Sequence, residues 1–361
     1  MKKLNLKYFG FLVLFLWIYI FLCPFSYSLK TPNPKTISAS TQLHYPKDLP
    51  ITEEQTVLMG TDVSILILSS EKERAKNAIQ TGFQEIKRIE DLMTDWKESP
   101  LEEINRQAGK KPVNINKELM FLLKESKEIS KITHGAFDIT YAPLGKLWDY
   151  NQISPKIPSQ EKIQKALDLV GYQNLQLDDK KNTAFLTKPG MRIGLGGIAK
   201  GYAVDRAVKK IKQLGFENFA VNAGGDLTVK GRKDGHLWTV GIRHPRRLEE
   251  NLALLPVSNG TVVTSGDSER YFILNGQRYC HILNPLTGYP ATQIQSVTIL
   301  ANKAYWADAL ATGVFVLGPI EGMKLIESLP HIEGMLVDAH GNIQVSSGLK
   351  KGAHGGKFGK L

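Results

Sequence analysis

Cysteine is nearly absent from this sequence. Only Cys23 and Cys280 occur in 361 residues, too few for the several bridges that hold a small secreted domain together. A structural zinc site usually takes four cysteine or histidine ligands at short spacing, and neither cysteine is accompanied by several histidines. The sequence therefore argues against a disulfide scaffold and against a zinc-dependent fold.

Several familiar catalytic patterns are also missing. The chain has no Walker phosphate loop, no Ser-His-Asp order and no pair of zinc-binding histidines, and no internal repeat is evident. It does have a hydrophobic share of 42% and a charged share of 22%, which excludes wholesale disorder and a collagen-like chain. The length fits one large α/β domain as well as two smaller ones.

Acidic residues are outnumbered. Forty-six Lys and Arg residues against 35 Asp and Glu residues give a formal net charge of +11, which suits an anionic partner such as a phosphorylated ligand, an acidic lipid surface or nucleic acid. A nucleic-acid binder needs a stripe of basic and aromatic side chains, and none is apparent. We therefore expect no nucleic-acid partner.

The first 28 residues have the pattern of a secretory signal peptide. Three lysines precede a nearly uncharged apolar run from Phe9 to Leu22, and small residues follow up to Ser28. The run is shorter than the roughly 20 residues that a membrane span needs. We therefore expect export to the periplasm with cleavage after Ser28. The alternatives are an uncleaved inner-membrane anchor and a lipid on Cys23, although Ile20–Leu22 lacks the small residues that usually precede a lipidated cysteine.

The remaining chain divides into three parts. Residues 29–52 are rich in Ser, Thr, Pro and Lys and are expected to be a linker, residues 53–348 a single folded domain, and residues 349–361 a basic tail rich in Gly and Lys. Helical and strand patterns mingle without strict alternation, which predicts an α+β domain with a mixed sheet. The main expected helices begin after a Ser70–Glu73 capping box, after Asn116, and after Ser159 with an end at Gly171.

The most informative stretch is a glycine-rich turn, Arg192–Gly201, that leads into a helix. Exposed amides at a helix N-terminus suit a phosphate, and Lys200 adds a full positive charge. Gly194–Ala199 also fits the dinucleotide fingerprint of a Rossmann unit. The acidic residue expected about 20 positions later is missing from its place, however, since Glu217 precedes the next strand. A third interpretation is that the glycines only allow close helix packing.

Asp308 and Thr312 stand four residues apart in a segment with strong helical propensity. That spacing puts both oxygens on one helical face. A carboxylate and a hydroxyl, completed by carbonyl and phosphate oxygens, are ligands of the kind that Mg²⁺ prefers. The structural alternative is an aspartate near a helix N-terminus and a threonine bonded to the preceding turn.

Two further segments could belong to a site. Ala136, Phe137 and Asp138 combine a turn, an aromatic ring and a carboxylate, which could hold an adenine or sugar hydroxyls; a core phenylalanine and a capping aspartate explain them equally well. His281 precedes an Asn-Pro turn and is the most site-like of the eight histidines. A solitary histidine is usually structural, but one beside a phosphate site can act as a general base.

Taken together, these segments resemble the FAD:protein FMN transferase family, also called ApbE-like. The resemblance spans about Met59 to Leu317 and depends on seven blocks in the same order. The blocks are Met59–Thr61, Ala136–Thr140, Leu195–Asp205, Val221–Asp226, Ser265–Gly266, His281–Pro285 and Trp306–Thr312. Seven ordered blocks are far more specific than any one of them, and the Rossmann interpretation is set aside.

The resemblance implies an exported, Mg²⁺-dependent enzyme with a T-fold-related domain. Such an enzyme cleaves FAD and attaches FMN through its phosphate to a Thr or Ser of an acceptor flavoprotein, and AMP leaves. FAD-binding positions are implied at Met59, Trp96, Ala136, Phe137, Asp138 and Lys200, and metal ligands at Gly197, Asp308 and Thr312. Catalytic roles are implied for Lys200 and for His281, which would accept the proton of the acceptor hydroxyl.

The sequence departs from the family pattern at two positions. Relatives usually carry Asp where this chain has Gly194, and they usually read Asp-Pro where it has Asn284 and Pro285. Loss of the first carboxylate bears on FAD placement and metal loading. An FAD-binding protein without turnover, or a pyrophosphatase that splits FAD into FMN and AMP, is therefore the alternative function.

Overall fold

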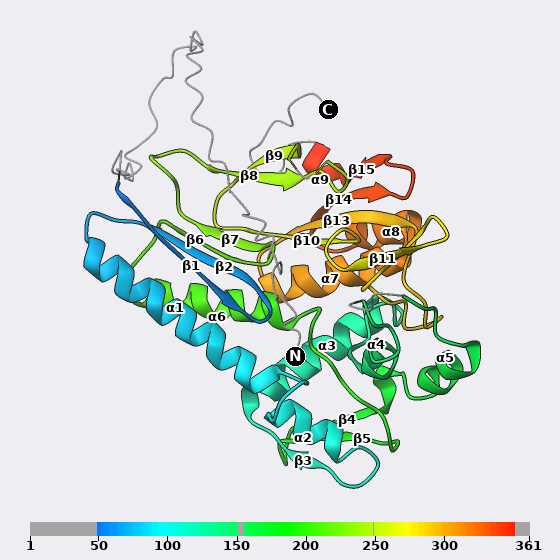
Figure 1. Cartoon of the computed structure of the whole chain (residues 1–361). Coiled ribbons are helices and arrows are strands. Elements are labelled where there is room, and N and C mark those ends of the chain that lie inside the picture. Colours follow the sequence, from blue (N-terminus) through cyan, green and yellow to red (C-terminus); the bar gives the residue numbers. More distant parts are fainter. Residues whose placement is uncertain (1–48, 151–154, 248, 351–361) are drawn as a thin grey trace, which may run out of the picture. The chain divides into compact units, whose positions relative to one another are not determined.

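An eight-stranded antiparallel sheet is the scaffold on which the rest of the chain is built (Figure 1). The structure, a computed structural model, describes residues 49–150, 155–247 and 249–350. The order in the sheet is β1-β2-β6-β7-β10-β13-β14-β15. These strands are β1 (Ile51–Leu58), β2 (Thr61–Leu68), β6 (Phe219–Ala223), β7 (Asp226–Lys230), β10 (Thr261–Gly266), β13 (Ile294–Ala301), β14 (Glu333–Asp338) and β15 (Ile343–Val345).

Three small sheets and a set of helices surround this scaffold, which confirms the predicted α+β class. The sheet is not mixed as predicted, because among the described strands every pairing in the large sheet is antiparallel. The small sheets contain β3 (Val113–Asn114), β4 (Leu175–Asp178), β5 (Thr183–Leu186), β8 (Trp238–Arg243), β9 (Asn251–Val257), β11 (Tyr271–Leu274) and β12 (Gln277–Cys280). The described helices are α1 (Lys72–Met93), α2 (Pro100–Arg106), α3 (Lys117–Ile132), α4 (Ala142–Gly145), α5 (Gln160–Leu167), α6 (Ala199–Gln213), α7 (Ala304–Leu317), α8 (Pro319–Ser328) and α9 (Ser347–Lys350), with 3₁₀ turns at Ile139–Tyr141 and Tyr172–Asn174.

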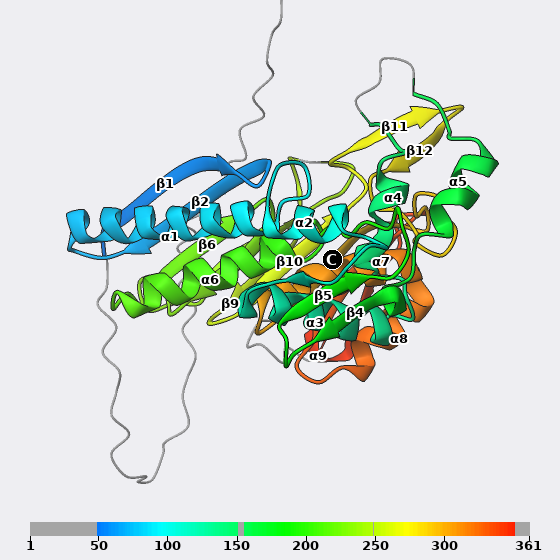
Figure 2. The same ribbon diagram turned by 90° about the horizontal axis from the view of Figure 1, so that it is seen from below.

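Both faces of the large sheet are covered. Along β2, Ile65 and Ile67 point into the core shared with the helices, whereas Leu66 and Leu68 point into a second core under the β8–β9 hairpin. This follows from the two-residue period of a strand, which sends alternate side chains to opposite faces. Helices α1 and α6 lie side by side beneath the sheet in Figure 1, and Figure 2 shows them from below.

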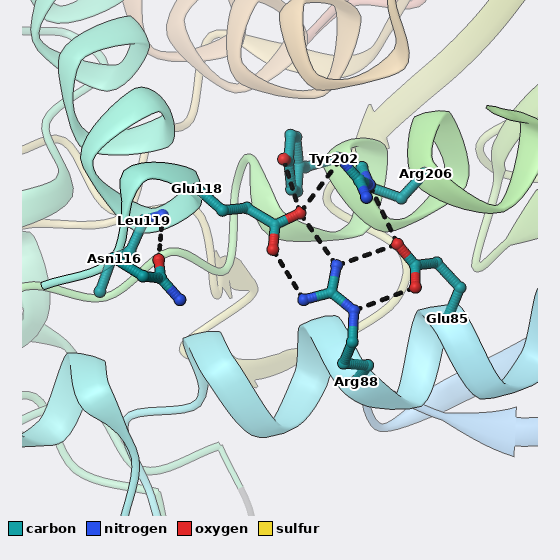
Figure 3. Close-up of polar contacts among 7 residues, drawn as sticks. All are labelled: Glu85, Arg88, Asn116, Glu118, Leu119, Tyr202 and Arg206. Atoms are coloured by element: carbon teal, nitrogen blue, oxygen red, sulfur yellow. Dashed lines mark hydrogen bonds and ion pairs between the residues drawn. The ribbon is translucent and has the colours of Figure 1, made fainter. Parts of the chain in front are cut away.

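A network of charged side chains joins three helices that are distant in sequence (Figure 3). Arg88 of α1 donates to both oxygens of Glu85, at 3.0 and 2.9 Å, and to both oxygens of Glu118 of α3, at 2.7 and 2.9 Å. From α6, Arg206 donates to Glu85 at 3.0 Å and Tyr202 to Glu118 at 2.9 Å. Because Glu85 is buried, the network fixes how α1, α3 and α6 are placed against one another.

Helix starts were predicted better than helix ends. The Asn116 side chain accepts from Leu119 N at 2.8 Å and the Ser159 side chain from Lys162 N at 3.4 Å, which confirms both as N-caps. The Ser70–Glu73 capping box was wrong, because α1 begins at Lys72 and the Oγ of Ser69 accepts from the backbone of Glu71. The helix predicted after Ser159, which is α5, ends at Leu167 and not at Gly171. After Leu167 the chain continues through turns that lead into the 3₁₀ helix at Tyr172–Asn174.

The predicted boundaries can be compared with the structure only in part. The first strand starts at Ile51, inside the predicted 29–52 linker, because Ile51–Leu58 pairs along its whole length with β2. The signal peptide and residues 351–361 of the tail lie outside the described residues. Within the ranges described, no helix is both long enough and apolar enough to cross a membrane.

Candidate nucleotide site

The predicted glycine turn leads into a helix, α6, and the start of α6 packs against the start of α7. α6 begins at Ala199 with no side-chain cap at its N-terminus. Gly201 is pressed against the start of α7, since a Cβ atom there would lie 2.3 Å from the backbone oxygen of Ala304. Close packing, one of the interpretations that the sequence left open, therefore holds at this turn; phosphate binding there stays a prediction.

Lys200 forms an ion-pair cluster with two aspartates from other elements. Its Nζ lies 3.2 Å from Oδ1 of Asp308 on α7 and 3.4 Å from Oδ2 of Asp226 at the start of β7. The other oxygen of Asp308 accepts from the backbone N–H of Gly201 at 3.1 Å. Asp308 thus bonds to the start of α6 instead of capping its own helix.

Two carboxylates share this buried space with one ammonium group. Burial alone would lower the pKa of Lys200, but the charges of Asp226 and Asp308 outweigh it and raise that pKa above its ordinary value. Burial, and next the charge of Asp308, raise the pKa of Asp226 well above normal. Within the described residues Oδ2 of Asp226 has no hydrogen-bond partner, only the longer contact with Lys200. The cluster therefore has acceptor capacity that a cation could use.

The predicted metal ligands come together around the same turn. Asp308 and Thr312 occupy successive turns of α7, and Thr312 Oγ1 lies 3.1 Å from the position that a Cβ atom would take at Gly197. Among the described residues no three His, Cys, Asp or Glu side chains form a metal-binding group. A cation here would depend on carboxylate, hydroxyl and carbonyl oxygens, the set that Mg²⁺ accepts.

The predicted Ala136–Asp138 segment lies against the turn, but its carboxylate has a structural task. The ring of Phe137 comes within 3.4 Å of a Cβ position at Gly197. Asp138 accepts from Thr140 N and Oγ1, at 2.8 and 2.7 Å, and from Tyr172 N at 2.8 Å. Burial raises its pKa. The capping alternative therefore describes Asp138, while Ala136 and Phe137 are buried beside the site; their contact with FAD stays a prediction.

His281 lies near the other side of the cluster. Its backbone N–H donates to Arg270 O at 2.9 Å, and Arg270 Nη2 approaches the Met59–Gly60 turn, 3.7 Å from the Cβ position of Gly60. Burial lowers the pKa of His281 to about 4; the charges of Arg270 and Lys200 act in the same direction, and a hydrogen bond to the Arg270 backbone acts against them. The imidazole is therefore neutral at pH 7, and its Nδ1 has no partner among the described residues.

Trp96 is the predicted site residue that the structure leaves most open. Its side chain is 68% exposed, and its contact with FAD stays a prediction. The preceding residue, Asp95, brings its Oδ2 within 3.3 Å of the Cβ position of Gly194, and the Tyr141 hydroxyl lies 3.5 Å from that position. The loop after α1 therefore reaches the beginning of the glycine turn.

Sequence reasoning missed three residues of this site. No site role was predicted from the sequence for Asp226, at the end of a family block, for Asp95, beside Trp96, or for Tyr141. The available signal for Asp226 was its place directly after Gly224 and Gly225. For Asp95 and Tyr141 no local pattern indicated a contact with the turn.

Comparisons with known proteins point to one family. The ApbE family profile matches residues 59–336. A Klebsiella pneumoniae protein named FAD:protein FMN transferase is 33% identical over 294 residues, 81% of this chain and 90% of that protein. The crystal structure of the ApbE protein from Thermotoga maritima superimposes with a TM-score of 0.78 at 36% identity, covering 84% of this chain and 99% of that one. The Pseudomonas stutzeri flavinyl transferase ApbE, in its apo form, gives a TM-score of 0.76 at 25% identity, covering 86% of this chain and 98% of that one.

Proposed function

This chain belongs to the ApbE family, and on that premise we propose how it works as an FAD:protein FMN transferase. The acceptor is a Thr or Ser hydroxyl of a flavoprotein. Its oxygen attacks the phosphorus of the FMN half of FAD, and the bond from that phosphorus to the AMP oxygen breaks. AMP leaves, and FMN stays attached to the acceptor protein. The hydroxyl proton passes to a base.

The observation that carries this proposal is the contact between Lys200, Asp226 and Asp308 at the start of α6. A transferring phosphoryl group needs positioning and neutralisation of its negative charge more than covalent help. Lys200 supplies one fixed positive charge at the start of α6. The carboxylates of Asp226 and Asp308 hold the Lys200 ammonium at the turn. They would repel an anion that approached the ammonium from the side on which they lie.

Magnesium is proposed to bind at Asp308, Thr312 and the carbonyl of Gly197. The donor set fits, since Thr312 lies beside Gly197 and the buried Oδ2 of Asp226 is left without a hydrogen-bond partner within the described ranges. When bound, the ion would neutralise charge on the phosphate oxygens. The chain itself contributes the rigid spacing on α7 and the close approach that a glycine at 197 permits.

His281 is proposed as the base that accepts the proton of the acceptor hydroxyl. A base must be unprotonated before the reaction, and burial keeps this imidazole neutral at pH 7. Its Nδ1 has no partner within the described ranges. A phosphate arriving beside Lys200 would raise the low pKa of His281, because a negative charge favours the protonated form.

Incubation with FAD, Mg²⁺ and a purified acceptor domain tests the proposal. Mass spectrometry should show the acceptor heavier by one FMN phosphoester, with one AMP released per adduct, and chelation of the metal should abolish both. FMN and AMP without an adduct would instead support the pyrophosphatase, and FAD that stays intact would support a binding protein. These two alternative outcomes matter because this chain has Gly194 where relatives usually carry an acid.

Export to the periplasm, with or without inner-membrane attachment, is proposed from the apolar run at Phe9–Leu22. Cell fractionation of the full chain and of a variant lacking residues 1–28 tests it. The full chain should be found in the periplasmic or membrane fraction and the shortened chain in the cytoplasm. Equal distribution of the two would contradict the proposal.

A further inference from the structure

The carboxylate of Asp95 stands where the first residue of the glycine turn has no side chain. Oδ2 of Asp95 lies 3.3 Å from the position that a Cβ atom would take at Gly194. A side chain on residue 194 would meet this carboxylate at a distance tighter than ordinary contact. Because residue 194 is glycine, the space beside its Cα is free for the carboxylate of Asp95, which lies 99 positions earlier in the chain.

The approach of Asp95 is fixed by bonds between the two segments. Arg192 Nη2 donates to the backbone oxygen of Asp95 at 3.0 Å, and its guanidinium also grips both oxygens of Glu102, at 3.0 and 2.6 Å. Next along the chain, Ile193 N donates to Asn105 Oδ1 at 2.7 Å, and Asn105 Nδ2 donates to Ile193 O at 3.1 Å. Paired bonds of this kind hold the α1–α2 loop in register with the turn.

The Asp95 carboxylate keeps capacity to accept hydrogen bonds. Apart from a bond to its own backbone, it has no hydrogen-bond or ion-pair partner within residues 49–150, 155–247 and 249–350. Arg192, the cation nearest in sequence to the turn, is engaged by Glu102. An ionised carboxylate offers about four acceptor positions, and a partly buried one gains from filling them.

The glycine turn therefore carries opposite charges at its two ends. Asp95 stands at Gly194, and Lys200 stands six residues later at the start of α6. The turn between them has no side chain at residues 194, 196 and 197, where the nearest groups are Tyr141, Phe137 and Thr312. A ligand lying along the turn would place its phosphate near Lys200 and a hydrogen-bond donor near Asp95.

We infer that Asp95 is a ligand-positioning carboxylate that accepts a hydrogen bond from a hydroxyl or N–H group of the bound FAD, in place of a side chain at residue 194. The inference rests on the proposed function, since FAD is the ligand. It assigns the missing acid of the turn to the α1–α2 loop, directly beside the exposed ring of Trp96. The carboxylate positions the nucleotide and takes no part in proton transfer.

The inference is tested by measuring the affinity of the full chain for FAD, with quenching of flavin fluorescence as the signal of binding. Asp95→Ala should weaken binding about tenfold, the loss expected for one hydrogen bond to a charged group. Asp95→Asn keeps one neutral acceptor and should lie between Asp95→Ala and the unaltered chain. Asp91→Asn is the matched control: that aspartate is near in sequence but pairs with Lys87 and Lys97 at the surface, and its loss should leave FAD affinity unchanged.

Moving the carboxylate gives a sharper test. Gly194→Asp alone should bind FAD no better than the unaltered chain, because two carboxylates would crowd the same space. Combining Gly194→Asp with Asp95→Ala should restore affinity to within about threefold of the unaltered chain, a recovery in which the two changes are not additive. Melting temperatures of all variants separate loss of binding from loss of folding.

Each outcome has a definite meaning. Unchanged affinity in a folded Asp95→Ala variant overturns the inference and leaves the proposed function in place. If the double variant binds FAD no more tightly than the weaker-binding single variant, an acid at residue 194 does not take the place of Asp95, and that part of the inference is overturned. If the unaltered chain itself does not bind FAD, the proposed function fails and the inference fails with it.

Discussion

The ammonium of Lys200 lies 3.2 Å from the carboxylate of Asp308, although 108 residues separate them in the chain. The contact joins the first turn of α6 to the face of α7 that also carries Thr312. It is possible because Gly201 lets the two helix starts approach to backbone contact. The same contact brings the glycine turn and the oxygens of Asp308 and Thr312 to one place.

Removing the charge of Asp308 should stop catalysis and spare the fold. Asp308→Asn keeps the shape of the side chain and its contact with Gly201, but it weakens the grip on a divalent cation. We expect kcat/KM for AMP release to fall at least about 100-fold, a loss of roughly 3 kcal/mol. Circular dichroism should show an unchanged fold. Glu321→Gln on α8, an exposed residue that pairs with Lys324, should keep full activity; equal activity of the two variants would refute the metal-ligand role.

Adding one methyl group at Gly201 should destabilise the protein. A Cβ atom there would lie 2.3 Å from the Ala304 oxygen and 2.5 Å from its carbon, which are backbone atoms that cannot rotate away. Gly201→Ala should therefore lower the free energy of unfolding by about 1–3 kcal/mol in spite of alanine's better helix propensity. Urea denaturation measures the change. Lys209→Ala, an exposed position in the same helix, should shift it by less than about 0.5 kcal/mol; similar losses in both would show that α6 and α7 tolerate separation.

The low pKa of His281 should make stability depend on pH. The unfolded chain protonates this residue near pH 6.5, whereas burial lowers its pKa to about 4 in the folded state. Between these values the unfolded state binds more protons, so stability rises with pH and is lost as the pH falls through that window. Unfolding midpoints at pH 4.5, 5.5 and 7 should therefore vary less in His281→Gln than in the unaltered chain. His340→Gln changes an exposed histidine and should keep the original slope. Identical slopes in all three proteins would contradict the burial of a neutral imidazole.

Breaking the network at Glu85 should loosen the helix layer. Glu85 is buried and accepts from Arg88 and Arg206; first the hydrogen bond from Arg88 lowers its pKa, and burial opposes that effect. Glu85→Gln should cost about 1–3 kcal/mol at pH 7, because Arg206 and Arg88 then lose a charged partner. The difference from the unaltered chain should shrink as the pH falls through the lowered pKa, since protonation removes the same charge. Glu73→Gln, with a side chain 80% exposed, is the control and should change stability by less than about 0.5 kcal/mol; a Glu85 variant as stable as this one would refute the network's role.

Local patterns were enough to predict the glycine turn, the helical face of Asp308 and Thr312, and the Asn116 cap, but not Asp95, Tyr141 or the role of Asp226. The glycine turn and the following helix could be predicted because glycine, lysine and helical periodicity act over a few residues. Asp308 and Thr312 could be placed on one helical face because the period of an α-helix fixes which side chains are neighbours. Asn116 could be identified as an N-cap because its side chain bonds only three residues away.

The alternatives at Asp138 show where local reasoning stopped. The sequence allowed a ligand contact or a capping role, and the structure shows that its second oxygen accepts from Tyr172, 34 residues later. No nearby pattern indicates that bond, because it depends on how the 3₁₀ turn at Tyr172 folds back across the chain. The start of α1 was misplaced because Ser70 suits an N-cap by sequence, whereas in the structure the N-cap is Glu71 without a side-chain cap, and Ser69 Oγ accepts from the Glu71 backbone.

By itself, the amino-acid order determined where most of the turns, helices and strands form, and it placed Asp308 and Thr312 on one helical face. Only the tertiary structure decided that Asp226 faces Lys200 and that Asp95 fills the space beside Gly194. Those contacts join β7 to α6 and the α1–α2 loop to the glycine turn, and they arise when the sheet and its helices pack. The physical reason is range: a side chain's neighbours along the chain follow from helix and strand periods, whereas its neighbours across the core are set by the packing of all the elements at once.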